Sequence, residues 1–282
     1  SPPFLNTKFL GRVRSQPEEF KKLVPEFVES LRALDDAPPT LWYGFDEPGA
    51  LPELEVGSAL YDAYKQANPY VPVVVVFARR VQLPIETMAD IVCVDTYWVP
   101  GRNDVTSIIP EVEGASRLAR EMHLPFFNVF QANMWSGASQ ATTPREQRVQ
   151  TYLALTEDVS GLSWFAWNNG IYAEMLEELK ALNREIQALA PVLLTRTPPQ
   201  KVTTDKTHSD IHLLLKQHAG KLYLVTANLS RQAADVTFTL PVLRAASTVK
   251  VLFKDRNIEA RGNAFTDKFL GYDTHVYEMD PS

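Results

Sequence analysis

Residues 41–48 read Leu-Trp-Tyr-Gly-Phe-Asp-Glu-Pro. The first five are mostly apolar and aromatic, which predicts a short buried strand. Asp46 and Glu47 follow directly, and Pro48 then stops the strand. Because buried parallel strands carry functional residues at their C-terminal ends, a carboxylate held here beside aromatic rings is a candidate general acid with a raised pKa. The alternative is that both carboxylates only cap the next turn or pair with a surface arginine.

The composition of the 282-residue chain is that of an ordinary globular protein, with 45% hydrophobic and 22% charged residues. The length suits one large domain or one and a half. A net charge of −6 argues against a nucleic-acid partner, because phosphate binding needs a basic surface. No apolar run approaches the roughly 18 residues of a membrane span, so we expect no membrane partner. The chain begins Ser-Pro-Pro, without an initiator Met or a signal peptide, which leaves its compartment open.

Strand and helix patterns alternate through the first two thirds of the chain. Residues 71–78 form a near-continuous β-branched run, which predicts a strand buried on both faces, as in a parallel sheet. The single Cys93 lies in a similar run, so we expect a packing residue, and it excludes an internal disulfide or a thiolate metal cluster. The predicted strands cover residues 41–45, 71–78, 91–98, 125–131 and 162–167, and the predicted helices cover about 15–34, 52–67, 107–123, 143–158 and 172–190. Five strand–helix units in a row predict an α/β fold.

Two parallel architectures fit this alternation. A doubly wound sheet that binds a nucleotide needs a Gly-rich phosphate turn, and none follows any predicted strand, so we expect no nucleotide cofactor. The predicted strand ends instead carry carboxylates, amides and indoles, which a (β/α)8 TIM-type barrel gathers in one pocket. These residues are Asp46, Glu47, Arg79, Arg80, Asp95, Tyr97, Trp98, Gln131, Asn133, Trp135, Trp167, Asn168 and Asn169. Flat aromatic faces beside polar groups suit a sugar ring, with ordinary core packing as the alternative for each Trp taken alone.

The composition changes after Pro191. Residues 195–200 read as a linker, and apolar and polar residues then alternate along 211–216, 221–228, 234–240, 248–253 and 275–279. With Ala219-Gly220 as a hairpin turn, this pattern predicts a small antiparallel β-sandwich. We therefore expect a partial barrel over residues 1–195 and the sandwich over 196–282. Three histidines, His208, His212 and His218, lie in different elements and are not accompanied by carboxylate or cysteine residues that could serve as further metal ligands. We therefore expect these histidines at the surface and predict no metal site.

Several motifs together resemble one enzyme family. Residues 41–48, 60–69 and 89–97 look like the second half of a clan A-type glycoside hydrolase barrel. The resemblance continues at 130–132, 143–146, 161–165 and 185–194, and residues 265–277 are similar to the final strands of the β-sandwich appended to many such enzymes. It implies hydrolysis of O-glycosides in a poly- or oligosaccharide, a carbohydrate substrate as partner, and a secreted or periplasmic location. Nothing in the sequence requires a cofactor.

The resemblance also assigns catalytic residues. In that clan an acid/base glutamate follows the fourth strand, usually as Asn-Glu-Pro, and Glu47 matches it, with Asp46 in place of the asparagine. The clan's nucleophile is a glutamate that ends the seventh strand, where this chain has Gln131, which cannot act as a nucleophile. The second carboxylate is then Asp95 or Asp46, acting as a base on water, or one outside this chain. Carboxyl groups roughly 6.5–9.5 Å apart imply an inverting enzyme and about 5–5.5 Å a retaining one. Asp46 has a further reading, in which it only tunes the pKa of Glu47 through like-charge repulsion.

The sugar would be held by residues within and after the predicted strands. They are Tyr43, Tyr97, Trp98, Gln131, Asn133, Trp135, Trp167 and Asn168. If the resemblance holds, strands one to three of the barrel are missing, and five units cannot close a barrel. The chain is then a fragment, a processed piece or one partner in a composite barrel, which an N-terminal segment or a second chain completes. The alternative function is a non-catalytic carbohydrate-binding protein on a degenerate barrel, which Gln131 favours and the retained Asp-Glu-Pro opposes.

Overall fold

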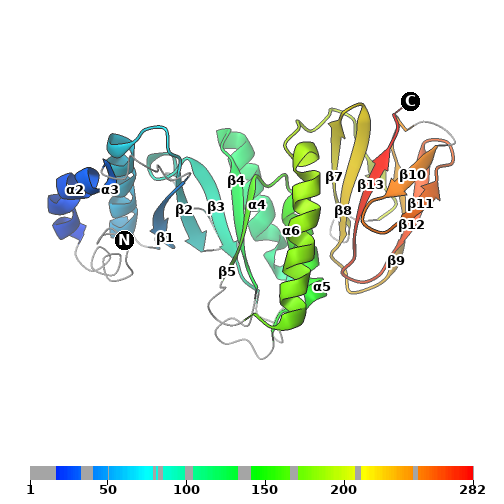
Figure 1. Cartoon of the computed structure of the whole chain (residues 1–282), viewed down its shortest axis with the longest axis horizontal. Coiled ribbons are helices and arrows are strands. Elements are labelled where there is room, and N and C mark those ends of the chain that lie inside the picture. Colours follow the sequence, from blue (N-terminus) through cyan, green and yellow to red (C-terminus); the bar gives the residue numbers. More distant parts are fainter. Residues whose placement is uncertain are drawn as a thin grey trace. The chain divides into compact units, whose positions relative to one another are not determined.

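The computed structural model of the chain describes residues 17–32, 41–49, 51–78, 81, 85–98, 104–132, 141–165, 171–206, 211–243 and 247–281 (Figure 1). The chain divides into two compact units. One is made of residues from 1–96 and 113–129, and the other of residues from 97–112 and 130–282. Among the helices in the described ranges, none combines the length and the apolar character that crossing a membrane requires.

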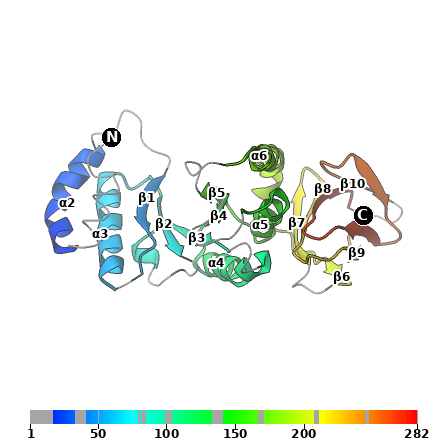
Figure 2. The ribbon, with the colours of Figure 1, turned by 90° about the horizontal axis from the view of Figure 1, so that it is seen from below.

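The first unit holds the beginning of a parallel sheet, with one helix packed against its first strands and a second helix packed on that one. Its elements include α2 (Pro17–Arg32), β1 (Trp42–Asp46), α3 (Leu51–Ala67), β2 (Val73–Ala78), the short 3-10 helix η1 (Ile85–Thr87) and β3 (Ile91–Thr96). Helices α2 and α3 lie side by side (Figure 2). Phe27 of α2 meets Tyr64 of α3 edge-on at 5.4 Å, and Tyr64 stacks on Trp42 of β1 at 5.2 Å between ring centroids. These rings pack α3 against both α2 and the first strand.

The strands of the parallel sheet follow one another in chain order. The order is β1-β2-β3-β4-β5, where β4 is Phe126–Gln131 and β5 is Gly161–Phe165. A doubly wound sheet reverses its order partway, whereas a (β/α) barrel adds each strand beside the previous one. The predicted barrel-type fold is therefore confirmed for the later strands. Within the described ranges the sheet has five of the eight strands that close such a barrel.

Burial of the sheet follows the apolar runs in the sequence. The first five residues of β2 are all buried, which is the two-sided burial expected of a parallel strand. Cys93 in β3 is also buried and packs with Val74 and Val76, so its interpretation as a packing residue is confirmed. Burial raises the pKa of the Cys93 thiol to about 12, with a smaller contribution from Asp95. The thiol therefore stays protonated and unreactive at neutral pH.

The second unit begins with helices and the last parallel strand. These elements are η2 (Val105–Ile108), the first residues of α4 (Ile109–Met122), α5 (Pro144–Thr156), β5 and α6 (Ala173–Leu193), with α5 and α6 packed side by side (Figure 1). The expected capping box opens α5, with reciprocal hydrogen bonds between Thr143 and Glu146. Helix α6 continues past its predicted end, because the amide of Leu194 still donates to the carbonyl of Ala190 and Pro191 is accommodated in the last turn.

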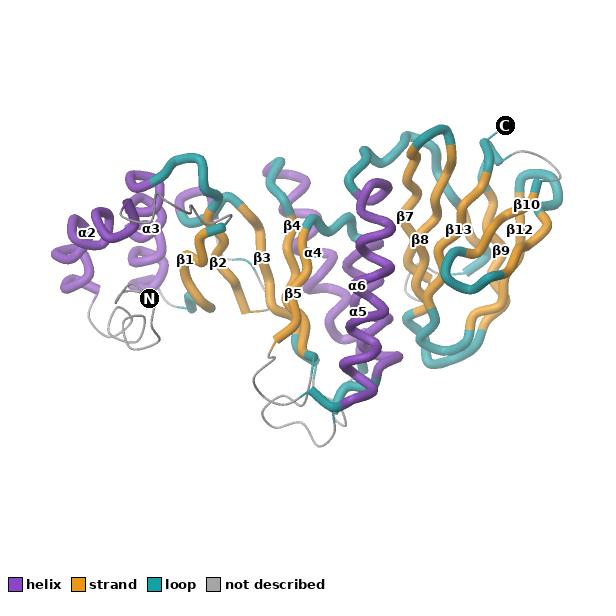
Figure 3. The backbone as a smooth tube through the Cα atoms, in the orientation of Figure 1, coloured by secondary structure: helices purple, strands orange, loops and turns teal. Residues whose placement is uncertain are grey.

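The rest of the second unit is an antiparallel sandwich (Figure 3). Its strands are β6 (Thr203–Thr204), β7 (Ile211–His218), β8 (Lys221–Asn228), β9 (Ala234–Thr239), β10 (Thr248–Val251), β11 (Arg256–Glu259), β12 (Ala264–Phe269) and β13 (Thr274–Met279). They form one sheet in the order β11-β10-β13-β8-β7 and a second in the order β12-β9-β6. Phe238 and Phe265 of the second sheet meet Tyr277 of the first at 5.6 and 4.9 Å between ring centroids. Two sheets that share one buried core confirm the predicted sandwich.

The alternation of apolar and polar residues does not predict β6, β11 or β12, and a buried charge explains this for β12, which only the resemblance over residues 265–277 includes. Asp267 lies on the inward face of β12 between Phe265 and Phe269, where the alternation of strands leads one to expect an apolar residue. Its carboxylate accepts two hydrogen bonds from Arg256 of β11, at 2.9 and 2.7 Å, and lies 2.7 Å from the Nδ1 atom of His275. Burial alone raises the pKa of Asp267, but the hydrogen bonds from His275 and Arg256 outweigh it and hold that pKa well below its usual range.

Candidate active site

Three carboxylates lie at the C-terminal edge of the parallel strands in the first unit. Asp46 is the last residue of β1, Glu47 follows it, and Asp95 is the penultimate residue of β3. Strand β2 runs between them, with Val76 opposite Asp46 and Ala78 opposite Asp95. The C-terminal ends of parallel strands share one edge of a sheet, so the structure brings together the three carboxylates named from the sequence.

Asp95 is the buried member of this trio. Its exposed fraction is 5%, whereas Asp46 and Glu47 are exposed. Burial raises the pKa of Asp95 to about 8, and a hydrogen bond with Glu47 and the charges of Glu47 and Asp46 act in the same direction. Asp95 therefore keeps its proton at neutral pH and donates it in a hydrogen bond to Glu47.

Glu47 has an unusual backbone conformation. Its φ angle is 47°, in the left-handed region that non-glycine residues rarely adopt. The proline that follows would favour an extended conformation for Glu47 instead. The amide of Glu47 donates to the carbonyl of Val76 at 2.7 Å, which continues the pairing of β1 with β2 beyond the last strand residue. Strained backbone of this kind concentrates at functional sites, where the surrounding structure holds it in place.

Tyr43 reaches Asp46 because β1 carries a bulge. The Tyr43 hydroxyl donates to Oδ1 of Asp46 at 2.7 Å. Residues three apart in a regular strand point to opposite faces. The pairing of β1 with β2 shifts between Tyr43 and Phe45, and this irregularity around Gly44 places both polar side chains on one face. The bulge thus adds a half-exposed phenol to the carboxylate cluster.

We expect Gly44→Ala to destabilise the protein, because a Cβ atom at Gly44 would lie 2.7 Å from Cγ1 of Val73 and 3.2 Å from Cγ2 of Val75. Overpacking of this kind costs about 1–3 kcal/mol in the free energy of unfolding, which urea denaturation measures. Gly114→Ala is the matched control. Gly114 lies inside α4, where an added Cβ would meet no atom within 4 Å, so this substitution should gain about 0.5–1 kcal/mol. Equal stability of Gly44→Ala and the parent would contradict a close approach of β2 at the bulge.

Two aromatic rings stack at strand ends in the second unit. The rings of Tyr97 and Phe165 lie 5.9 Å apart at 24°, and Phe165 is 41% exposed. Tyr97 is a predicted sugar contact, whereas Phe165 is not among the residues selected from the sequence. The predicted strand over 162–167 puts Phe165 in its interior, and the described part of β5 covers Gly161–Phe165. Residues 166 and 167 lie outside the described ranges, so the predicted strand end stays a prediction.

Trp98 and Gln131 lie in a buried polar network of the second unit, and each is 1% exposed. The Trp98 indole donates to Gln150 at 3.2 Å, and the Gln131 amide donates to Thr142 at 2.9 Å. Gln150 in turn donates to the carbonyl of Gln131 at 3.1 Å. The position that the sequence resemblance matches to the clan's nucleophile thus holds a neutral amide fixed by its neighbours. Sugar contacts of Trp98 and Gln131 stay predictions.

Other residues selected from the sequence lie outside the described part of the chain. They are Arg79, Arg80, Asn133, Trp135, Trp167, Asn168 and Asn169. His208 also lies outside it. The surface position predicted for His212 is wrong, because its exposed fraction is 0%. Helix α5 packs over β7, and the Nδ1 atom of His212 lies 3.7 Å from the carboxylate of Glu157, which follows that helix.

Comparison with known proteins places the fold. No family model matches the sequence, and a search of curated proteins gives no match. Among solved structures, the chain is similar to a GH27 β-L-arabinopyranosidase from Geobacillus stearothermophilus (TM-score 0.60, 10% identity, 91% of this chain and 61% of that one). It is also similar to an Anoxybacillus alpha-amylase (TM-score 0.56, 8% identity, 94% and 64%). A third is the maltogenic alpha-amylase AmyB from Thermotoga neapolitana (TM-score 0.55, 13% identity, 92% and 66%).

The chain therefore spans slightly less than two thirds of the length of these glycosidases. At such low identity the likeness concerns the fold alone. It confirms the architecture implied by the sequence motifs, since these relatives are TIM-barrel glycosidases with C-terminal β domains. The chain has the fold of the C-terminal portion of a clan A-type glycoside hydrolase barrel with an appended β domain.

Proposed function

We propose that the chain is part of an O-glycoside hydrolase acting on a poly- or oligosaccharide, with Glu47 and Asp95 as its acid/base group. One observation carries this proposal: a buried Asp95, whose pKa is raised to about 8, is hydrogen-bonded to the exposed Glu47 at the C-terminal edge of the parallel strands. A general acid needs a proton that it still holds near neutral pH, and this pair holds one. The fold shared with glycosidases agrees with this assignment.

Each carboxyl group has its own part in the proposed reaction. Glu47 is exposed and delivers the proton to the glycosidic oxygen as the bond between that oxygen and the anomeric carbon breaks. Asp95 is shielded from water and passes its proton to Glu47 along their hydrogen bond. A water molecule then attacks the anomeric carbon and gives up a proton to a second carboxylate.

The second carboxylate is a separate group. Because Glu47 and Asp95 are hydrogen-bonded, they lie closer than the roughly 5–5.5 Å that separates an acid from a nucleophile in a retaining enzyme. They therefore act as one acid, and Gln131 supplies no charge. At this edge of the first unit the remaining candidate is Asp46, held by the Tyr43 hydroxyl. A carboxylate on polypeptide outside the described residues is the other candidate.

Further polypeptide is proposed to complete the barrel. In the described sheet β5 is an end strand that neighbours only β4, although a closed barrel has no end strand. An apolar hollow of about 280 Å³ lies beside β5 and α6, with Trp164, Ile186 and Leu194 in its lining. Leu194 is 79% exposed, which leaves apolar surface for another segment to cover. An N-terminal segment or a second chain would supply the missing strands.

The experiment that tests the function compares the protein with Glu47→Gln on a broad panel of glycans and aryl glycosides, measuring released reducing ends or aglycone. We expect hydrolysis of one class of glycoside and a loss of about 100- to 10,000-fold in rate for Glu47→Gln. Glu55→Gln is the matched control, because Glu55 is an exposed glutamate of the same unit on α3 and should leave the rate unchanged.

Three other outcomes are informative. Hydrolysis that survives in Glu47→Gln moves the acid to another residue and contradicts the proposal. Glycan binding without hydrolysis supports the degenerate, non-catalytic barrel, which the neutral Gln131 favours. If a protein that includes the missing strands neither binds nor hydrolyses any glycan, both functions are refuted.

A further inference from the structure

A second cavity lies in the second unit, between α5, α6 and the turns of the sandwich. Its volume is about 440 Å³, within the range of about 300–1,000 Å³ that small-molecule sites occupy. Side chains from three elements that are far apart in the sequence line it, among them Arg145, Glu178 and Lys254. None of the residues selected as catalytic belongs to its lining.

The helical wall of this cavity carries fixed hydrogen-bonding groups. Arg148 of α5 is held at 2.7 Å by Glu178 and at 2.8 Å by Glu185, both on α6. The Tyr152 hydroxyl donates to Glu185 at 2.7 Å. These side chains are mostly buried and hold one another in place, so their remaining donor and acceptor positions are preorganised.

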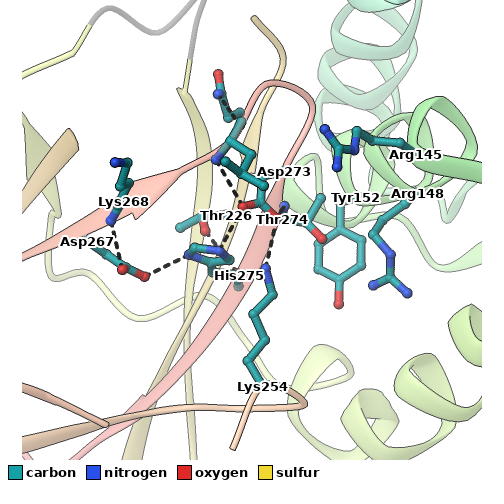
Figure 4. A network of polar contacts seen from close by, with 12 residues as sticks. Arg145, Arg148, Tyr152, Thr226, Lys254, Asp267, Lys268, Asp273, Thr274 and His275 are labelled. Carbon is teal, nitrogen blue, oxygen red and sulfur yellow. Dashed lines mark hydrogen bonds and ion pairs between the residues drawn. The ribbon is translucent and has the colours of Figure 1, made fainter. Parts of the chain in front are cut away.

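The sandwich wall carries a second fixed ion pair. Lys254 donates to Asp273 at 2.8 Å, and Asp273 also lies 3.2 Å from the Nε2 atom of His275 (Figure 4). Figure 4 also shows the Arg145 side chain of α5 pointing toward Asp273 and Thr274, where β13 begins. Burial raises the pKa of Asp273, but hydrogen bonds from His275 and Lys254 outweigh it and hold that pKa well below its usual range. Asp273 is therefore a permanent acceptor at working pH.

An aromatic ring adds an apolar surface to these polar groups. Phe253 lines the cavity and is 49% exposed. Its φ angle is 63°, so a bulky side chain occupies the left-handed region in the turn between β10 and β11. Such a conformation costs free energy in a phenylalanine, and a glycine would adopt it freely. Phe253 is therefore favoured at this turn neither by burial of its ring nor by the preferred backbone conformation of phenylalanine.

We propose that this cavity is a second, non-catalytic carbohydrate-binding site. Arg145, Arg148 and Lys254 are balanced by Glu178, Glu185 and Asp273, so the cavity does not select an anion or a cation. Sugar hydroxyl groups both donate and accept hydrogen bonds and therefore suit this mixture. The Phe253 ring offers a flat face to the apolar side of a sugar ring. The choice of a carbohydrate among neutral polar ligands rests on the proposed function.

Isothermal titration with maltotriose, cellotriose, xylotriose and galactotriose tests this site, using Glu47→Gln protein so that hydrolysis does not interfere. We expect binding of at least one of these trisaccharides. Adding Phe253→Gly should remove one binding event or weaken it by about tenfold or more, because the exposed aromatic face is lost. Phe253→Tyr keeps the ring and should restore binding. Tyr70→Ala, which removes a 92% exposed ring from the first unit, is the control and should bind as the parent does.

The results separate this proposal from the proposed function. Loss of trisaccharide binding in Phe253→Gly keeps the second site, and inactivity of the parent sequence in a protein that includes the missing strands refutes the hydrolase alone. Hydrolysis by the parent with unchanged binding in Phe253→Gly overturns the second site alone. Binding of inorganic phosphate but of no trisaccharide identifies an anion site and also overturns it. Because glycine suits the left-handed φ at this position, a folding defect is not expected in Phe253→Gly, and circular dichroism checks this.

Discussion

Asp95→Asn should make the protein more stable at pH 8 and, at the same time, a much slower hydrolase. The unfolded chain releases the Asp95 proton near the ordinary pKa of about 3.9, whereas the folded chain keeps it until about pH 8. Between these values the folded protein binds more protons than the unfolded one, so its stability falls as the pH rises. Asparagine has no such proton and escapes this loss.

The stability gain of Asp95→Asn should therefore depend on pH. It should be near zero below pH 4, grow between pH 4 and pH 8, and approach about 5 kcal/mol at pH 8, since each pKa unit corresponds to about 1.4 kcal/mol. Urea denaturation of both proteins at pH 4 and pH 8 measures it. Asp62→Asn, which changes an exposed aspartate of α3, is the control and should show no comparable trend. A gain that is the same at both pH values would rule out a raised pKa as its cause.

The catalytic effect of the same substitution should have the opposite sign. Asparagine keeps a hydrogen bond to Glu47 but has no carboxyl proton to pass on, so we expect a fall of about 100- to 10,000-fold in rate. The activity of the parent should decline as the pH rises past about 8, when Asp95 loses its proton. That decline should be absent from the residual activity of Asp95→Asn. A pH profile identical to that of the parent would remove Asp95 from the acid/base group.

Asp158→Asn should lower the free energy of unfolding by about 2–4 kcal/mol. Lys216 of β7 has a side chain only 1% exposed, and its ammonium group lies 2.7 Å from Oδ1 of Asp158 and 2.7 Å from the carbonyl of Thr195. Removing one partner of a buried ion pair leaves an uncompensated charge, which costs about 3–5 kcal/mol. The Asp158 side chain is 40% exposed, so water screens part of this cost. We therefore expect about 2–4 kcal/mol rather than about 3–5 kcal/mol.

A double substitution separates the charge from other effects of Asp158→Asn. The φ angle of Asp158 is 61°, a conformation that asparagine tolerates as well as aspartate, so the backbone is not perturbed. Lys216→Met removes the buried charge and fills similar volume with an apolar side chain. In that background Asp158→Asn should cost less than about 1 kcal/mol. An equal cost of Asp158→Asn in both backgrounds, measured by urea denaturation, would show that the ion pair does not stabilise the fold.

Local periodicity was enough to predict the order of helices and strands from α2 to α6. The β-branched run at 71–78 and the capping box at Thr143 and Glu146 are local signals, and both correspond to observed elements. The alternation pattern misses β12, because Asp267 faces inward and its burial depends on Arg256 and His275. The local pattern of apolar and polar residues does not reveal these two partners of Asp267, because they lie on other strands.

Some features of the candidate site are also predicted by the sequence, and others depend on packing. Asp46, Glu47 and Asp95 follow from strand ends, which the sequence marks well. The raised pKa of Asp95 does not follow from it, because that depends on how deeply β3 is covered. The contact of Tyr43 with Asp46 needs the bulge at Gly44, which a regular strand pattern does not contain. Residue type thus predicts which groups gather, and packing decides which of them keeps a proton.

The end position of β5 has a consequence for handling the protein. Among the described strands β5 neighbours β4, and an edge strand of a sheet can pair with another strand, including the same strand of a second molecule. Phe165 at the end of β5 and Leu194 just after α6 are both exposed and add apolar surface to such an encounter. On the proposal that further polypeptide completes the barrel beside β5, production of this chain without that polypeptide should favour edge-to-edge self-association, and co-production with it should suppress self-association.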